Sequence, residues 1–194
     1  TMTTTHKTLC GARGALLLTT EKDKADAIDF AVFPGEQGGP HINNIVAKAV
    51  AFKLALSDDF QEMQRKIREN AQYLVAALEK KGLKLAYGGT ESHMFLLDLK
   101  PLKGPQKYSL RGEVASRILD LCGITLNKNT IAGDTNAAHP SAIRIGTTWI
   151  TQRGFGKPEL DKLAELIHRV LTSAVPFHYI GPSAELGRAK IDYK

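Results

Sequence analysis

Short uncharged runs alternate with apolar residues at helical spacing along most of this chain, and that alternation limits the folds open to it. Residues 15–20 form an uncharged run, which predicts a strand buried on both faces. Further strands are predicted at residues 93–99 and 142–146, with a shorter one at 124–126. Alternating helices and strands pack in layers around a shared core, so the pattern predicts a layered α/β or α+β fold.

Four helices are predicted from apolar residues spaced three and four apart. The first follows residues 34–40, where glycine and proline interrupt regular structure. The second begins after Ser57, a good amino-terminal cap, and ends at Gly82. The third is stopped by Gly123, and the last has its apolar face within residues 160–171. We place a boundary between two lobes along the first two helices.

The composition sets limits on the class of protein. With 194 residues and 43% hydrophobic content, the chain can form one ordinary domain or two small lobes. No uncharged stretch approaches the roughly 18 residues of a membrane span, and the first residues lack the pattern of a signal peptide, so a cytoplasmic protein is expected. Cys10 and Cys122 are far apart and form no CxxC pair, so neither a disulfide framework nor a metal site is predicted.

The chain is basic, with a formal net charge of +6. The positive residues are spread along the sequence and form no arm or single stripe, which disfavours nucleic-acid binding. Small anionic ligands such as phosphate, carboxylate or glutamylated folate remain compatible with this surplus.

Lys7 lies among small hydroxylated residues in TTTHKTLCGARG, just before a glycine-rich turn. Most lysines occupy solvated surface positions. A buried lysine differs, because desolvation lowers its pKa and frees the amine for Schiff-base formation. The residues alone leave both interpretations of Lys7 open.

Four segments in order resemble the serine hydroxymethyltransferase family: TTTHKTLCGARGALLL, AVFPGEQGGPH, ITLNKNTIAGD and SAIRIGTTWITQRGF. Ordered motifs spread over residues 1–155 are far more specific than a single HK or GG pair. The resemblance implies an α/β fold of the fold type I, aspartate-aminotransferase-like class of pyridoxal-phosphate-dependent transferases. Residues 1–57 would be the end of the large domain, and residues 58–194 the small carboxy-terminal domain.

The resemblance also implies a cofactor site. Lys7 corresponds to the lysine that forms the Schiff base with pyridoxal 5'-phosphate, which implies that Lys7 is buried. His6 and Arg13 correspond to its neighbours at the cofactor. Gly39 corresponds to a glycine whose backbone N–H reaches the phosphate from the other subunit, as a glycine before a helix can do. Without the resemblance, His6 is equally a packed histidine, Arg13 a surface cation and Gly39 a turn residue.

Two further residues are assigned by the resemblance to substrate binding. Arg144 corresponds to the arginine that binds the amino-acid carboxylate, a role suited to its planar, two-pronged group of donors. Asn129 corresponds to a residue that contacts the folate pteridine. From the residues alone, Arg144 is otherwise an edge residue of a strand and Asn129 a turn former.

The implied activity is the interconversion of serine and glycine in one-carbon metabolism and amino-acid biosynthesis, with tetrahydrofolate as cosubstrate. The implied assembly is a homodimer or higher oligomer. Family members carry a long stretch before the cofactor lysine, which supplies other groups of the site. This chain is therefore expected to be part of a larger enzyme, to require the amino-terminal half as its partner and to be inactive alone.

Other functions remain open at this point. Another fold type I enzyme, such as a threonine aldolase or an aminotransferase, would not depend on folate. A non-catalytic interaction module would leave Lys7 idle, so its replacement would be silent. Binding of RNA or DNA through the basic surface would depend steeply on salt concentration.

Overall fold

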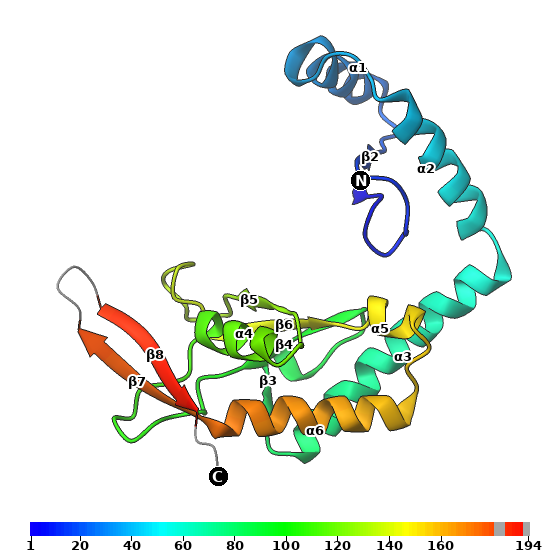
Figure 1. Cartoon of the computed structure of the whole chain (residues 1–194). Coiled ribbons are helices and arrows are strands. Elements are labelled where there is room, and N and C mark those ends of the chain that lie inside the picture. The colour runs from blue at the N-terminus through cyan, green and yellow to red at the C-terminus, as the bar shows by residue number, and fades with distance from the viewer. Residues whose placement is uncertain (181–184, 192–194) are drawn as a thin grey trace. The chain divides into compact units, whose positions relative to one another are not determined.

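The computed structural model describes residues 1–180 and 185–191. The chain divides into two units, Thr1–Gln64 and Arg65–Lys194, each of which is described by itself. The division falls inside helix α3, and the predicted domain boundary at residue 58 coincides with the start of that helix. In Figure 1 the first unit contains β1 (Met2–Thr4), β2 (Ala15–Leu17), α1 (Lys22–Phe30), the wide turn η1 (Ala31–Glu36), α2 (Ile42–Ala55) and the start of α3 (Asp58–Lys80).

Strands β1 and β2 form an antiparallel pair, with Met2 opposite Leu17 and Thr4 opposite Ala15. The predicted strand at residues 15–20 is therefore present but shorter. The prediction that it is buried on both faces is wrong, because Leu17 is 50% exposed. Within the described part of this unit β2 pairs only with β1, and a two-stranded ribbon cannot enclose its own side chains.

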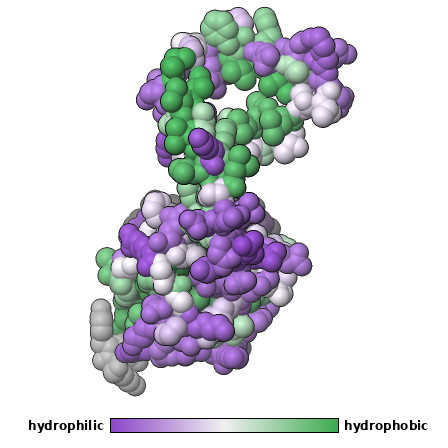
Figure 2. All heavy atoms as spheres, turned by 90° about the vertical axis from the view of Figure 1, so that its right-hand side faces the viewer, coloured by the Kyte–Doolittle hydropathy of each residue, from purple (hydrophilic) through white to green (hydrophobic). Residues whose placement is uncertain are grey.

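Helix α2 confirms the predicted helix after the glycine- and proline-rich segment. Its large apolar side chains do not form a core within the first unit. Five of them are at least half exposed: Ile42, Ile45, Val46, Val50 and Leu54. In Figure 2 large green areas, the colour of hydrophobic residues, lie on the visible face of the first unit beside purple and white ones. An apolar surface of this extent is typical of a surface that another polypeptide covers.

Helix α3 begins and ends as predicted. The backbone N–H of Phe60 donates to the hydroxyl of Ser57 at 3.3 Å, which caps the first turn. Gly82 has a φ of +82° and ends the helix, a conformation that glycine adopts without strain. None of the helices in the described residues combines the length and the apolar character needed to cross a bilayer.

The second unit is built on a four-stranded antiparallel sheet in the order β3-β4-β6-β5. Its elements after α3 are β3 (Lys84–Leu85), η2 (Ala86–Gly88), β4 (Met94–Asp98), α4 (Gly112–Leu121), β5 (Asn127–Asn129), β6 (Ala142–Gly146), α5 (Thr148–Gln152), α6 (Lys157–Ser173), β7 (Ala174–Ile180) and β8 (Glu185–Ile191). The mixture of helices and strands agrees with the predicted α/β class.

Strands β4 and β6 confirm the predictions for residues 93–99 and 142–146, and they pair from Met94 opposite Gly146 to Asp98 opposite Ala142. Their side chains alternate, so that one face of the sheet is buried. Phe95 and Leu97 of β4 lie in the core with Ile143 and Ile145 of β6, and helices α3, α4 and α6 contribute most of its other residues. Figure 1 shows α4 and α6 beside the sheet.

The strand predicted at residues 124–126 is displaced to Asn127–Asn129. Gly123 has a φ of +80° and ends α4, and the N–H of Ile124 donates to the carbonyl of Leu119 at 2.8 Å. The backbone of Ile124 therefore completes the helix cap and does not join the sheet. Ile124 and Leu126 pack against the core from this connection.

Helix α1 and the β7–β8 hairpin were not predicted. The sequence of α1, KDKADAIDF, has few apolar residues and hence no helical periodicity. The hairpin pairs Ala174 with Ile191 at one end and Ile180 with Glu185 at the other. Pro176 lies within β7, where a proline weakens the sequence pattern of a strand.

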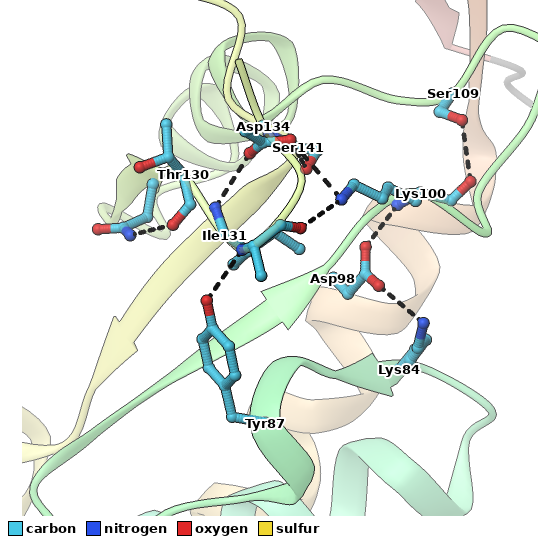
Figure 3. Close-up of polar contacts among 11 residues, drawn as sticks. Lys84, Tyr87, Asp98, Lys100, Ser109, Thr130, Ile131, Asp134 and Ser141 are labelled. Carbon is cyan, nitrogen blue, oxygen red and sulfur yellow. Dashed lines mark hydrogen bonds and ion pairs between the residues drawn. The ribbon is translucent and has the colours of Figure 1, made fainter. Parts of the chain in front are cut away.

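The loop between β5 and β6 is held by Asp134, as Figure 3 shows. The Asp134 carboxylate accepts hydrogen bonds from the hydroxyl of Ser141 at 2.6 Å and from the backbone N–H groups of Ile131 and Ser141, both at 3.0 Å. The Lys100 amine lies 3.7 Å from the same carboxylate and donates to the carbonyl of Ala132 at 3.0 Å. These contacts fix a loop that has no regular secondary structure.

The buried face of the sheet should dominate the stability of the second unit. Leu97 is fully buried, so Leu97→Ala is expected to lower the free energy of unfolding by about 2–5 kcal/mol through lost burial and a residual cavity. Leu121→Ala is the matched control, because Leu121 is 84% exposed at the end of α4. Urea unfolding followed by circular dichroism measures both. Equal effects of the two substitutions would contradict this description of the core.

The acid response of the second unit should depend on Asp134. Burial alone would raise the pKa of Asp134, but the hydrogen bonds from Ser141 and Ile131 and the charge of Lys100 outweigh it and lower the pKa from 3.8 to about 2. Because the folded state binds this proton more weakly than the unfolded state, the stabilisation is present above about pH 4 and is lost as the pH falls toward 2.

Asp134→Asn is therefore expected to lower the free energy of unfolding at neutral pH by about 1–2 kcal/mol, and to flatten its decline below about pH 4. Urea titrations at several pH values provide the measurement. Asp29→Asn serves as the control, since Asp29 is an exposed residue of α1. An unchanged pH profile in the Asp134 variant would refute the assignment.

Candidate functional site

The loop between β1 and β2 closes around the side chain of Thr5, which is fully buried. The Thr5 hydroxyl donates to the carbonyl of Ala12 at 2.7 Å, and its backbone N–H donates to the carbonyl of Gly14 at 2.9 Å. The N–H of Gly11 donates to the carbonyl of Thr5 at 2.8 Å. Both ends of the loop are thus bound to one residue, which limits its freedom to move.

Two glycines allow this loop to close. A Cβ atom at Gly11 would lie 2.9 Å from the carbonyl oxygen of Thr5 and 3.0 Å from the Cβ of Ala51 on α2. Gly14 has a φ of +145°, and a Cβ atom there would overlap the amine of Lys48. A larger residue at Gly11 would therefore crowd the loop against its own backbone and α2, and one at Gly14 would strain the backbone.

Lys7 lies at the exposed side of the same loop. Its carbonyl accepts a hydrogen bond from the N–H of Cys10 at 2.9 Å, and the side-chain amide of Gln64 donates to the carbonyl of the adjacent Thr8 at 3.1 Å. The expected burial of Lys7 is not found in this unit, because the loop folds around Thr5 and encloses that side chain. The backbone around Lys7 is fixed, while its amine stays accessible.

The other predicted cofactor residues of the first unit lie on two loops. His6 is half-buried, and its Nδ1 accepts from the N–H of Gly14 at 3.5 Å, a long contact that fits a packed histidine. Arg13 is exposed on the same loop. Gly39 precedes α2, and the position that its Cβ would occupy has no atom within 4 Å. The structure therefore brings His6, Lys7 and Arg13 onto one loop, with Gly39 on another.

The amino terminus of α2 is available to an anion. Its cap residue, His41, makes no side-chain hydrogen bond to the first turn. Uncapped backbone N–H groups and the helix dipole together favour a phosphate or carboxylate at such a position. Gly39, two residues earlier, leaves open space in front of it.

Arg144 lies on β6 in the second unit. Because side chains alternate along a strand, it projects to the face opposite Ile143 and Ile145, and it is only partly exposed. One guanidinium nitrogen donates to Oδ1 of Asn127 at 2.8 Å, and Asn127 is directly opposite Arg144 in the register of β5 and β6. Within the described residues Arg144 forms no ion pair, so its remaining donors can bind a carboxylate.

Asn127 was missed by sequence reasoning, although a pattern could have revealed it. Asn127 and Asn129 are two residues apart on one strand, so they share a face. Asn129 itself donates from its side-chain amide to the carbonyl of Thr130 at 2.7 Å. The structure thus places both asparagines on the face of Arg144, and one of them orients the arginine.

The loop after Asn129 is anchored from outside the strand. The hydroxyl of Tyr87 accepts a hydrogen bond from the N–H of Ala132 at 3.0 Å, and Lys100 holds the carbonyl of the same residue, as Figure 3 shows. Both contacts join residues far apart in sequence. They keep the edge of the sheet next to Asn129 in place.

Comparison with known proteins identifies the family of the chain. The family model described as serine hydroxymethyltransferase matches residues 1–167. A serine hydroxymethyltransferase of Endomicrobium trichonymphae is 49% identical over 172 residues, which cover 88% of this chain and 40% of that protein. The chain thus spans 40% of the length of this curated relative. It belongs to the serine hydroxymethyltransferase family.

Proposed function

We propose that this chain carries the cofactor lysine and the substrate arginine of an enzyme that interconverts serine and glycine, with tetrahydrofolate and 5,10-methylenetetrahydrofolate as the one-carbon carriers. The proposal rests mainly on the position of Lys7. It occupies a loop with a fixed backbone and an accessible amine, inside the segment that the family model matches. The proposal concerns the whole protein, because the chain spans 40% of its relative.

The residues of the first unit fit pyridoxal phosphate. Lys7 provides a primary amine for the aldehyde, and Arg13 an exposed cation on the same loop. The uncapped start of α2 beside Gly39 suits a phosphate group, and in the proposal Gly39 serves the phosphate held by the partner subunit. When bound, pyridoxal phosphate supplies an electron sink for negative charge at the α-carbon of the amino acid.

Lys7 holds the cofactor in the proposed site, and His6 supports the loop through Gly14. Arg144 binds the carboxylate of serine or glycine through two parallel hydrogen bonds, and Asn127 fixes the plane of its guanidinium. Orienting the substrate in this way selects which bond at the α-carbon is broken. Asn129 is proposed to contact the pteridine of the folate.

The proposal also includes the domain architecture and the assembly of the protein. Residues 1–57 are assigned to the large domain and residues 58–194 to the small domain of a cytoplasmic fold type I enzyme. We also propose a homodimer or a higher oligomer, and the exposed apolar side chains of α2 can be covered by the amino-terminal half of the protein or by a second subunit.

Replacing Lys7 should remove catalysis. Lys7→Ala in the whole protein is expected to reduce tetrahydrofolate-dependent conversion of serine to glycine to background, because no other residue takes over its covalent role. The matched control is Lys24→Ala, since Lys24 is an exposed lysine of the same unit paired with Glu21. Turnover with and without tetrahydrofolate is the measurement. Unchanged turnover of the Lys7 variant would support the interaction-module interpretation, and turnover independent of folate a different fold type I enzyme.

Arg144→Lys should weaken substrate binding more than it slows the chemical step. Lysine keeps the charge but loses the two-pronged geometry, so KM for serine is expected to rise roughly 10- to 100-fold. Arg117→Lys is the matched control, because Arg117 is exposed on α4 and paired with Glu113. Steady-state kinetics separate KM from kcat. A KM equal to that of the parent enzyme would exclude Arg144 as the carboxylate ligand.

A further inference from the structure

The second unit contains a pocket of about 520 Å³ that the proposed function does not use. Three segments contribute to it: the connection from β4 to α4, the loop between β5 and β6, and strand β7. Its principal lining residues are Lys100, Tyr108, Arg111, Asp134, His139 and His178. The lining is therefore rich in groups that bind anions.

Arg111 uses one guanidinium N–H group in a hydrogen bond within the protein, which leaves others that can bind a ligand in this pocket. Its Nε donates to the hydroxyl of Tyr108 at 3.3 Å, and its guanidinium carbon lies 5.4 Å from the centroid of the Tyr108 ring. Among residues 1–179 and 187–191, whose side chains the structure describes, no acidic side chain forms an ion pair with Arg111. The tyrosine thus orients the guanidinium without neutralising it.

The negative charge in the lining is already engaged. Asp134 accepts hydrogen bonds from Ser141 and Ile131, and Lys100 lies 3.7 Å from its carboxylate, as Figure 3 shows. Arg111 adds a positive charge, and the imidazoles of His139 and His178 add hydrogen-bonding nitrogens. The net charge of the pocket is positive.

The hairpin holds its part of the pocket in a defined position. The rings of His178 and Tyr108 are stacked, with centroids 5.2 Å apart and planes at 9°. The N–H of His178 donates to the side-chain carbonyl of Gln106 at 3.0 Å. A Cβ atom at Gly187 of β8 would lie 2.7 Å from the Tyr108 hydroxyl, so the hairpin packs closely on this connection. Tyr108 is thus a common platform for Arg111 and His178.

The β7–β8 hairpin, which contributes to the pocket, lies outside the residues that the family model matches. That match ends at residue 167, whereas β7 begins at Ala174. One wall of the pocket is therefore built by residues outside the matched region.

We propose that this pocket binds a small oxyanion, in the form of a phosphate group or of a short chain of carboxylates. Arg111 provides the paired donors that both groups require, and the imidazoles of His139 and His178 provide further hydrogen-bonding nitrogens. The proposal is independent of serine chemistry, so it can fail while the proposed activity stands.

Isothermal titration of the whole protein with inorganic phosphate and, separately, with triglutamate tests the proposal. Arg111→Gln removes the paired donors and is expected to weaken binding about tenfold or more. His178→Phe keeps an aromatic ring against Tyr108 but removes the imidazole, and a smaller loss is expected. Arg153→Gln is the matched control, because Arg153 is an exposed arginine outside the pocket.

Saturable binding that Arg111→Gln weakens and Arg153→Gln leaves unchanged supports the site. Tighter binding of phosphate then identifies a phosphoryl ligand, and tighter binding of triglutamate a carboxylate chain. If Arg111→Gln fails to fold by circular dichroism, His178→Phe decides the outcome. No saturable binding of either probe, or equal losses in the Arg153 control, would overturn the proposal.

Discussion

The pairing of β6 with β4 and β5 is the constraint on which the second unit depends. In this register Ile143 and Ile145 enter the core, and the residue between them, Arg144, must project to the other face. A shift by one residue would bury the arginine and expose both isoleucines. The hydrophobic core and the orientation of the proposed substrate arginine thus have the same physical cause, and Asn127 of β5 adds the contact that holds the guanidinium.

The first unit also holds a proposed functional side chain, that of Lys7, in a defined position, but without a large sheet. Only the two-stranded ribbon of β1 and β2 supports its loop within the described residues, so the buried side chain of Thr5 and the close approach of Gly11 to α2 hold the loop in place. Lys7 is then presented from a fixed backbone with an accessible amine. The exposed apolar side chains of α2 indicate that this unit gains much of its stability from contacts beyond itself.

Sequence reasoning succeeded where a local pattern reflects a buried face. The apolar spacing in α3 and α6 and the short, largely apolar runs of β4 and β6 predicted those elements, because one face of each lies in the core. Sequence reasoning failed where contacts between residues outside one local pattern determine the structure. The N–H of Ile124 is taken by a helix cap, which displaced β5, and the contact of Tyr87 with Ala132 joins residues 45 positions apart. The burial of Lys7 was also wrong for this unit, since no local pattern shows that the loop folds around Thr5.

The most direct test of the central claim is to map the site of covalent attachment of pyridoxal phosphate. The whole protein is incubated with the cofactor, reduced with borohydride and digested, and the modified peptide is sequenced by mass spectrometry. The account predicts a single pyridoxyl label on Lys7. A label on another lysine, such as the neighbouring Lys48, or no label at all, would contradict it.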